Sequence, residues 1–220
     1  MITHILAFDP SSTCTGYALA EAEPSLPMGA RILVGGIIRP RRADDAHRRI
    51  AETARDAVQV YTDALELIEP QRRHTLRVAV ETPGRSFGAR QRQAAGLLTY
   101  GMAVGAVHGA LALELHHGPC DDAEVLCIDP ADWKRWRGKQ ASRDRCADLW
   151  PDYDPAADTA DADMADACLI AAWACLRCAA APAPGSVPPG QRKPRQRKTA
   201  KPTKKTTGAL HPPIVIESDQ

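Results

Sequence analysis

Four carboxylates in this chain stand where a strand ends or a helix begins. Asp9 and Glu81 each follow a short apolar run of the kind that forms a buried β-strand, and Asp163 and Asp166 lie three residues apart at the front of an apolar helical stretch. Carboxylates are costly to bury unless they hold something positive. Mg²⁺ is a hard cation that takes oxygen ligands, carboxylates among them. The pattern therefore predicts a site for a pair of Mg²⁺ ions, and with it metal-dependent hydrolysis of phosphodiesters.

Each acid also has a simpler explanation as part of the fold. Asp9 precedes a proline and could be a turn residue that ends a strand, and Glu81 could be a solvated strand end. Asp163 could cap a helix, with Asp166 placed to favour the helix macrodipole. Two nearby acids could replace Asp163 as a ligand, namely Asp158 and Asp161. The set of four acids, considered together, favours a metal site.

Hydrophobic periodicity predicts the elements that must position these acids. Strands are expected at 2–9, 16–20, 32–38, 76–81 and 124–128, and helices at 46–69, 93–116, shortly after 130, 142–149 and 163–178. Asp44 or Asp45 is placed to cap the first helix. Three consecutive strands, the first two paired as a hairpin, and then alternating elements predict an α/β fold with a mixed five-stranded sheet flanked by helices.

The chain of 220 residues divides by composition into two parts. Eight of its 28 basic residues and only two of its 27 acidic residues follow residue 181, so residues 1–181 carry a net charge of −5 and the tail 182–220 is strongly basic. The first part suits one packed domain. The tail is rich in Pro, Lys and Arg with little apolar content, so we expect it to be disordered. It is either a solubilising extension or a tethered polycation for nucleic-acid phosphates.

The cysteines and the amino terminus indicate the compartment. Seven cysteines are scattered without a disulfide framework, and the sequence begins directly with a strand rather than a signal peptide. The expected location is therefore a reducing cytoplasm.

One apolar stretch, 96–115, has the length of a membrane span. It is rich in Gly and Ala and contains His108 and Glu114, so we expect a buried helix of a soluble domain and no membrane partner. Small residues recur along it at every fourth position, which lets two helices approach closely. This stripe of Gly101, Gly105 and Gly109 packs either on the sheet or in a dimer seam.

Three sequence blocks resemble the RuvC family of Holliday junction endonucleases, within the ribonuclease-H-like superfamily. Segment 5–18, Ile-Leu-Ala-Phe-Asp-Pro-Ser-Ser-Thr-Cys-Thr-Gly-Tyr-Ala, is similar to the family's opening Ile-Asp-Pro-Gly and Thr-Gly-Tyr motifs. Segment 78–81, Val-Ala-Val-Glu, resembles its second acidic strand. Segment 162–167, Ala-Asp-Met-Ala-Asp-Ala, is similar to its closing Asp-x-x-Asp-Ala block. The order and spacing of the blocks fit across residues 2–178.

The resemblance implies a ribonuclease-H-like fold and a Mg²⁺- or Mn²⁺-dependent endonuclease that acts as a homodimer on branched DNA, without a nucleotide cofactor. Two ions in each active site would activate water and steady the leaving oxygen. Asp9 would bridge them, with Glu81 on one and Asp166 on the other. Asp163, one helical turn earlier, would complete the shell or orient water. A nucleoid-associated location follows, and a bacterial or a phage origin is compatible with it.

Basic residues near these blocks complete the expected site. Lys134 matches one basic position of the family and Arg143 takes the place of a second, usually Lys, and both would neutralise the scissile phosphate or the developing charge. The residues expected to contact nucleic acid are Arg85, Phe87, Arg90, Arg92, Lys134, Lys139 and Arg143. A solvated loop is the alternative for the first four.

Two positions depart from the family's pattern. Ser11 stands where the family usually has Gly, which bears on the shape of the first turn. Phe87 lies further from Glu81 than the family's aromatic residue that probes the junction centre, which bears on selectivity for branched structures.

Other functions compete with a structure-selective junction endonuclease. A nuclease of the same fold could cut flaps, RNA–DNA hybrids or RNA, because specificity lies in loops and dimer geometry. A catalytically inactive nucleic-acid-binding protein would have lost part of the acidic set, which is intact here. An actin- or hexokinase-type ATPase needs two such domains and a second phosphate loop, for which about 180 ordered residues are too few.

Overall fold

The computed structural model describes residues 3–26, 28–41, 45–83, 94–118, 124–137, 141–150 and 162–179. The basic tail 182–220 lies outside these residues, so its expected disorder stays a prediction.

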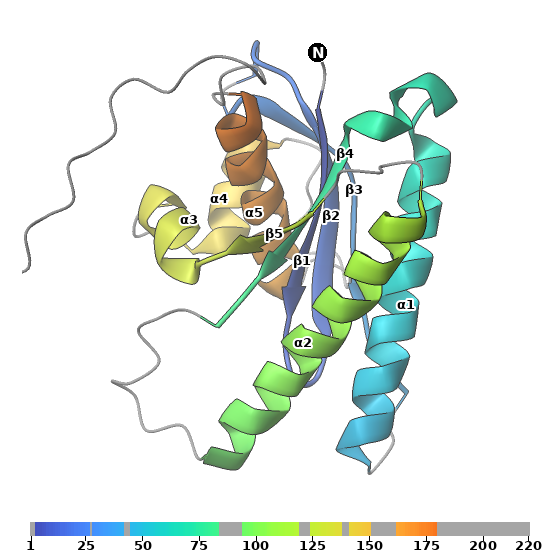
Figure 1. Cartoon of the computed structure of the whole chain (residues 1–220). Coiled ribbons are helices and arrows are strands. Elements are labelled where there is room, and N and C mark those ends of the chain that lie inside the picture. The colour runs from blue at the N-terminus through green and yellow to red at the C-terminus, as the bar shows by residue number, and fades with distance from the viewer. Residues whose placement is uncertain are drawn as a thin grey trace, which may run out of the picture. The chain divides into compact units, whose positions relative to one another are not determined.

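Five strands form one mixed sheet (Figure 1). They are β1 (His4–Pro10), β2 (Thr15–Ala22), β3 (Ala30–Ile38), β4 (Leu76–Glu81) and β5 (Val125–Ile128). Their order across the sheet is β3-β2-β1-β4-β5. The first three strands form an antiparallel meander, and β4 and β5 run parallel to β1. The predicted α/β class, the five strands and the opening hairpin are confirmed.

Helices cover both faces of this sheet. They are α1 (Ala46–Leu67), α2 (Ala94–His117), α3 (Pro130–Arg137), α4 (Ser142–Leu149) and α5 (Ala162–Ala179), with the 3₁₀ helix η1 (Pro70–Thr75) before β4. Figure 1 shows α1 and α2 on one side of the sheet and α3, α4 and α5 on the other. Asp45 caps α1 as expected, because its carboxylate accepts a hydrogen bond of 2.8 Å from the His47 N–H.

The first helix ends two residues earlier than expected. Ile68 is extended, and Glu69, the residue before Pro70, has left the helical conformation, with φ −51° and ψ 134°. A proline disfavours the helical conformation of the residue before it, which explains the early end.

Alternation along the central strand divides the core into two layers. Ile5 and Ala7 of β1 pack with α5, whereas Leu6 and Phe8 pack with α1 and α2. All seven residues of β1 are buried. Asp9 follows Ala7 by two positions, and its side chain therefore lies on the α5 face as well.

Helix α2 is buried along one face only. Its buried residues are Ala103, Val104, Val107, Leu111 and Leu115, whereas Leu98 and Leu113 are 67% and 57% exposed. Among the helices that the structure describes, this one alone has the length and composition of a membrane span, and 22% of that window is buried. One helix of this kind does not by itself indicate a membrane protein, because the core helix of a soluble protein meets the same criteria.

The expectation that this helix is buried is wrong for its outer face. A β-carbon at Gly101, Gly105 or Gly109 would meet nothing within 4 Å, so the glycine stripe does not pack on the sheet. The helix is apolar all round, and periodicity therefore could not tell which face is covered. Within the described part of the chain, the glycine stripe is left uncovered, because glycine buries less apolar surface than the valine and leucine side chains of the opposite face do.

Candidate active site

Asp9 and Glu81 lie side by side at one edge of the sheet. Strands β1 and β4 pair in parallel register up to the residues that precede the two acids. Ala7 and Ala79, two positions earlier on each strand, pack on the α5 side. Both carboxylates therefore face α5. They are buried there, with Asp9 9% and Glu81 4% exposed. Neither is a solvated strand end.

Helix α5 brings the other two acids to the same edge. Its first turn lies against Gly16 of β2, which is paired with Asp9. A β-carbon at Gly16 would lie 2.0 Å from the carbonyl oxygen of Asp163, so only glycine permits this approach. The helix begins at Ala162, which puts Asp163 inside the first turn, and its interpretation as the N-cap is wrong. Asp163 and Asp166 are partly buried.

Asp9 is the electrostatic centre of the group. Burial raises the pKa of its carboxyl well above the usual value, and the charges of Glu81, Asp166 and Asp163 raise it further. Lys134 acts in the opposite direction. We call these four acids, Asp9, Glu81, Asp163 and Asp166, the acidic cluster. The three acids predicted to share a site with Asp9 thus all act on it in the fold.

Glu81 is held by two consecutive residues of α3. The indole Nε1–H of Trp133 donates a hydrogen bond of 2.6 Å to Oε2, and Lys134 Nζ lies 3.4 Å from Oε1. Burial raises the pKa of Glu81, although both of these contacts lower it. The helix starts at Pro130, and the carboxylate of Asp129 accepts a hydrogen bond of 2.8 Å from the Ala131 N–H. The structure thus brings Lys134 next to one of the acids, and its role in catalysis stays a prediction.

A thiol contacts the acidic cluster from the turn after β1. Cys14 Sγ donates to Asp163 Oδ2 at 2.8 Å. The turn is closed by Ser11, whose hydroxyl donates to the Cys14 carbonyl at 2.7 Å and accepts from the Cys14 N–H at 3.1 Å. The serine that departs from the family's glycine therefore has its own structural part in this turn.

The sequence did not point to the contacts of Trp133 and Cys14. The Trp133–Glu81 contact joins residues 52 positions apart, and the Cys14–Asp163 contact joins residues 149 positions apart. The available signal was the tryptophan next to Lys134 in the sequence, and Trp133 is fully buried in the core.

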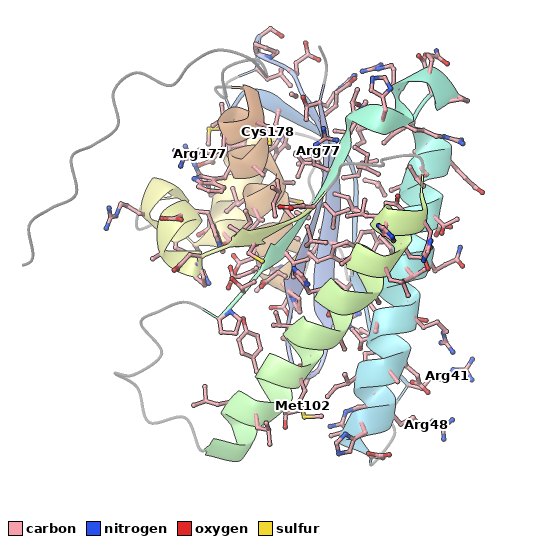
Figure 2. The ribbon with its side chains drawn as sticks, in the orientation of Figure 1. Arg41, Arg48, Arg77, Met102, Arg177 and Cys178 are labelled. Carbon is pink, nitrogen blue, oxygen red and sulfur yellow. The ribbon has the colours of Figure 1, made fainter. Side chains whose placement is uncertain are left out.

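The other predicted residues are Arg143 and a group outside the described part of the chain. Arg143 lies exposed on α4, and its role stays a prediction. Seven residues lie outside the described ones, namely Arg85, Phe87, Arg90, Arg92, Lys139, Asp158 and Asp161. The Cys175-x-x-Cys178 pair is remote from the site, because Figure 2 shows Cys178 at the far end of α5, near Arg77 at the start of β4.

The donor chemistry of the acidic cluster fits a divalent cation. Its ligands would be carboxylate oxygens, two of the four carboxylates are buried, and their mutual repulsion would be relieved by positive charge. In the described part of the chain no group of three or more His, Cys, Asp or Glu side chains is arranged as a ready-made metal site.

Known structures share this arrangement of elements. No protein-family model and no curated protein matches the sequence. The structure of T. thermophilus RuvC in complex with a Holliday junction substrate is similar to this chain with a TM-score of 0.55 at 19% identity, over 81% of this chain and 96% of that one. A second Thermus thermophilus RuvC structure has a TM-score of 0.50 at 21% identity, over 77% and 92%. The chain has a RuvC-like fold.

Proposed function

We propose that this protein is a metal-dependent DNA endonuclease that hydrolyses phosphodiesters at four-way (Holliday) or related branched junctions. The observation that carries the proposal is the position of the buried Asp9 in a RuvC-like fold, where Glu81 on the paired strand and Asp163 and Asp166 on α5 all act on its carboxyl. A protein that keeps so much negative charge together at a sheet edge gains most when a cation binds there. The solved relative bound to a Holliday junction substrate supports the choice of substrate.

The acidic cluster would hold Mg²⁺ or Mn²⁺, two ions in each site. When bound, such a pair activates water and stabilises the leaving oxygen. Asp9 would serve both ions, because it is the acid on which the other three act. Glu81 and Asp166 would each hold one side of the site, and Asp163 would orient water.

Lys134 would contact the scissile phosphate. Its side chain is 40% exposed while its ammonium rests on Glu81, so it can turn outward without unfolding anything. Once positive charge neutralises Glu81, the attraction that holds the ammonium there weakens. Lys134 then stabilises the negative charge that develops on the phosphate oxygens.

A second copy of this chain would supply the second active site that paired cuts in a junction require. The outer face of α2 suits this partner, since Leu98 and Leu113 are exposed on it and, among the residues that the structure describes, none lies within 4 Å of a β-carbon placed on Gly105 between them. Exposed apolar surface of this kind marks interaction sites, and small residues permit close helix contact.

The test is cleavage of an end-labelled four-way DNA junction in Mg²⁺, beside matched duplex, flap and RNA–DNA hybrid substrates. We expect paired symmetric nicks in the junction that are absent with Asp9→Asn. Cleavage of another substrate instead would keep the metal site and replace the specificity. Tight junction binding without any cleavage would leave a nucleic-acid-binding protein and overturn the enzyme.

A further inference from the structure

The indole of Trp133 occupies one oxygen of a carboxylate in the acidic cluster. Trp133 is fully buried, and its Nε1–H points at Glu81 Oε2 over 2.6 Å. An indole nitrogen can only donate a hydrogen bond, so this contact uses the only hydrogen-bonding group of the side chain. We propose that Trp133 is a positioning residue that makes Glu81 a metal ligand through a single oxygen, Oε1. The inference rests on the proposed metal site.

The two oxygens of Glu81 have different environments. Oε2 is committed to a buried neutral donor, and leaving either partner of such a bond unsatisfied would be costly. Oε1 faces Lys134, whose Nζ is 3.4 Å away on a partly exposed side chain. A partly exposed ammonium can move into solvent and yields its place to a cation more easily than a buried indole does. The cation therefore reaches Glu81 at Oε1.

A tryptophan suits this task because it is neutral and rigid. A neutral donor orients the carboxylate while leaving its full negative charge for the cation, which Lys or Arg in the same place would not do. The ring is fixed by the core that it shares with Ile128, Ala165 and Leu169. Partners that orient a ligand in this way typically govern metal affinity by about 10- to 100-fold.

The same ring also restrains Lys134. Its Nζ lies 4.8 Å from the centroid of the Trp133 ring, within the range of a cation–π contact. Trp133 thus determines which oxygen of Glu81 faces the metal, and it also holds the ammonium of Lys134 before a cation displaces that ammonium from Glu81.

Trp133→Phe tests the inference, because it removes the N–H donor and keeps most of the ring. The matched control is Trp150→Phe, since Trp150 is also buried and donates its indole N–H, but to the Ala30 carbonyl at 3.3 Å. Mn²⁺ binding to the full chain without DNA would be measured by titration calorimetry. We expect about 10-fold weaker binding or worse in Trp133→Phe. We expect the affinity of wild type in the control.

The outcomes separate this inference from the proposed function. A wild-type chain that binds no Mn²⁺ refutes the metal site and the inference with it. A wild type that binds, together with a folded Trp133→Phe of equal affinity, refutes the inference alone.

A second measurement on the wild-type chain covers the case in which Trp133→Phe does not fold. The chain has four tryptophans, hence four indole N–H resonances in a ¹⁵N spectrum. The resonance that moves in Glu81→Gln identifies the indole N–H of Trp133, which donates to Glu81. We expect this resonance to shift when Mg²⁺ is added to the wild-type chain. If Mg²⁺ binds and that resonance does not move, the inference is overturned.

Discussion

Asp9 and Gly16 face each other across the antiparallel pair of β1 and β2. The missing side chain of Gly16 leaves the space in which the backbone of Asp163 lies, so the acid on the strand and the acids on α5 can share one site. The Thr-Gly-Tyr block at 15–17 and the Asp-x-x-Asp block at 163–166 are therefore in direct contact, through Gly16 and the backbone of Asp163.

Gly16→Ala should displace α5 and destabilise the protein. The added methyl group would lie 2.0 Å from a backbone oxygen, which cannot move alone because it belongs to a helix. We expect a loss of about 3 kcal/mol or more in the free energy of unfolding, measured by urea denaturation. Gly96→Ala is the matched control, because nothing lies within 4 Å of its β-carbon and alanine favours the helix by up to about 1 kcal/mol. Equal stability of the two variants would contradict this account of α5.

Asp9→Asn should stabilise the metal-free protein while it abolishes cleavage. The substitution removes a buried charge that three neighbouring acids oppose. We expect the free energy of unfolding at pH 8 to rise by about 1 to 3 kcal/mol, by chemical denaturation in EDTA. A destabilised Asp9→Asn would contradict this, because it would show that the Asp9 carboxylate makes net favourable interactions in the metal-free protein.

The contribution of Asp9 and Glu81 to the stability of the metal-free protein should fall as pH rises. The pKa of Asp9 is raised above its usual 3.8, so the folded protein keeps this proton to higher pH than the unfolded chain does. In the window from about pH 4 up to that raised pKa, the unfolded chain binds fewer protons, and stability declines with pH. Glu81 acts in the same direction. Thermal unfolding between pH 4 and 8 should show this decline, and Mg²⁺ should reverse it. An unchanged melting temperature in Mg²⁺ would contradict a metal-binding role.

Lys134→Met should slow cleavage without preventing junction binding. The ammonium is the cation placed beside Glu81 and Asp9, and removal of one such stabilising group typically costs about 10²- to 10³-fold in kcat. Single-turnover kinetics would measure the loss, and a gel-shift assay would measure binding. Lys134→Arg should recover part of the rate. A Lys134→Met enzyme that cleaves at the wild-type rate would remove this residue from the mechanism.

Leu113→Lys should dissociate the proposed dimer. It places a charge in the exposed apolar face of α2, where we expect about a 100-fold rise in the dimer dissociation constant, measured by sedimentation equilibrium. Leu67→Lys is the control, because Leu67 is also exposed, 61%, but lies at the end of α1. Two results would contradict a dimer interface on the outer face of α2. One is a monomeric wild-type protein, and the other is a dimer that both variants leave intact.

The sequence predicted the strands and helices well where their signals are local. The apolar runs before Asp9 and Glu81 mark β1 and β4 because a buried strand has to be apolar, and the capping acid marks the start of α1. The short turn η1 was missed, because six mostly polar residues carry no periodic signal. The covered face of α2 could not be predicted from a helix with apolar residues on every side.

The acids of the site were predictable, but their supports were not. Asp9 and Glu81 end apolar strands, and Asp163 and Asp166 open an apolar helix, so the place of each acid at a strand end or a helix start is a local property. The hydrogen bond from Trp133 to Glu81 and the thiol contact from Cys14 to Asp163 depend on segments that meet only in the folded chain. Such contacts involve no spacing rule that a single sequence could display.

Anomalous diffraction from crystals grown in Mn²⁺ tests the central claim most directly, namely that the four acids form one metal site. The account predicts Mn²⁺ peaks enclosed by Asp9, Glu81, Asp163 and Asp166, with Glu81 bound through Oε1. Peaks elsewhere, or none among these side chains at millimolar Mn²⁺, would contradict it.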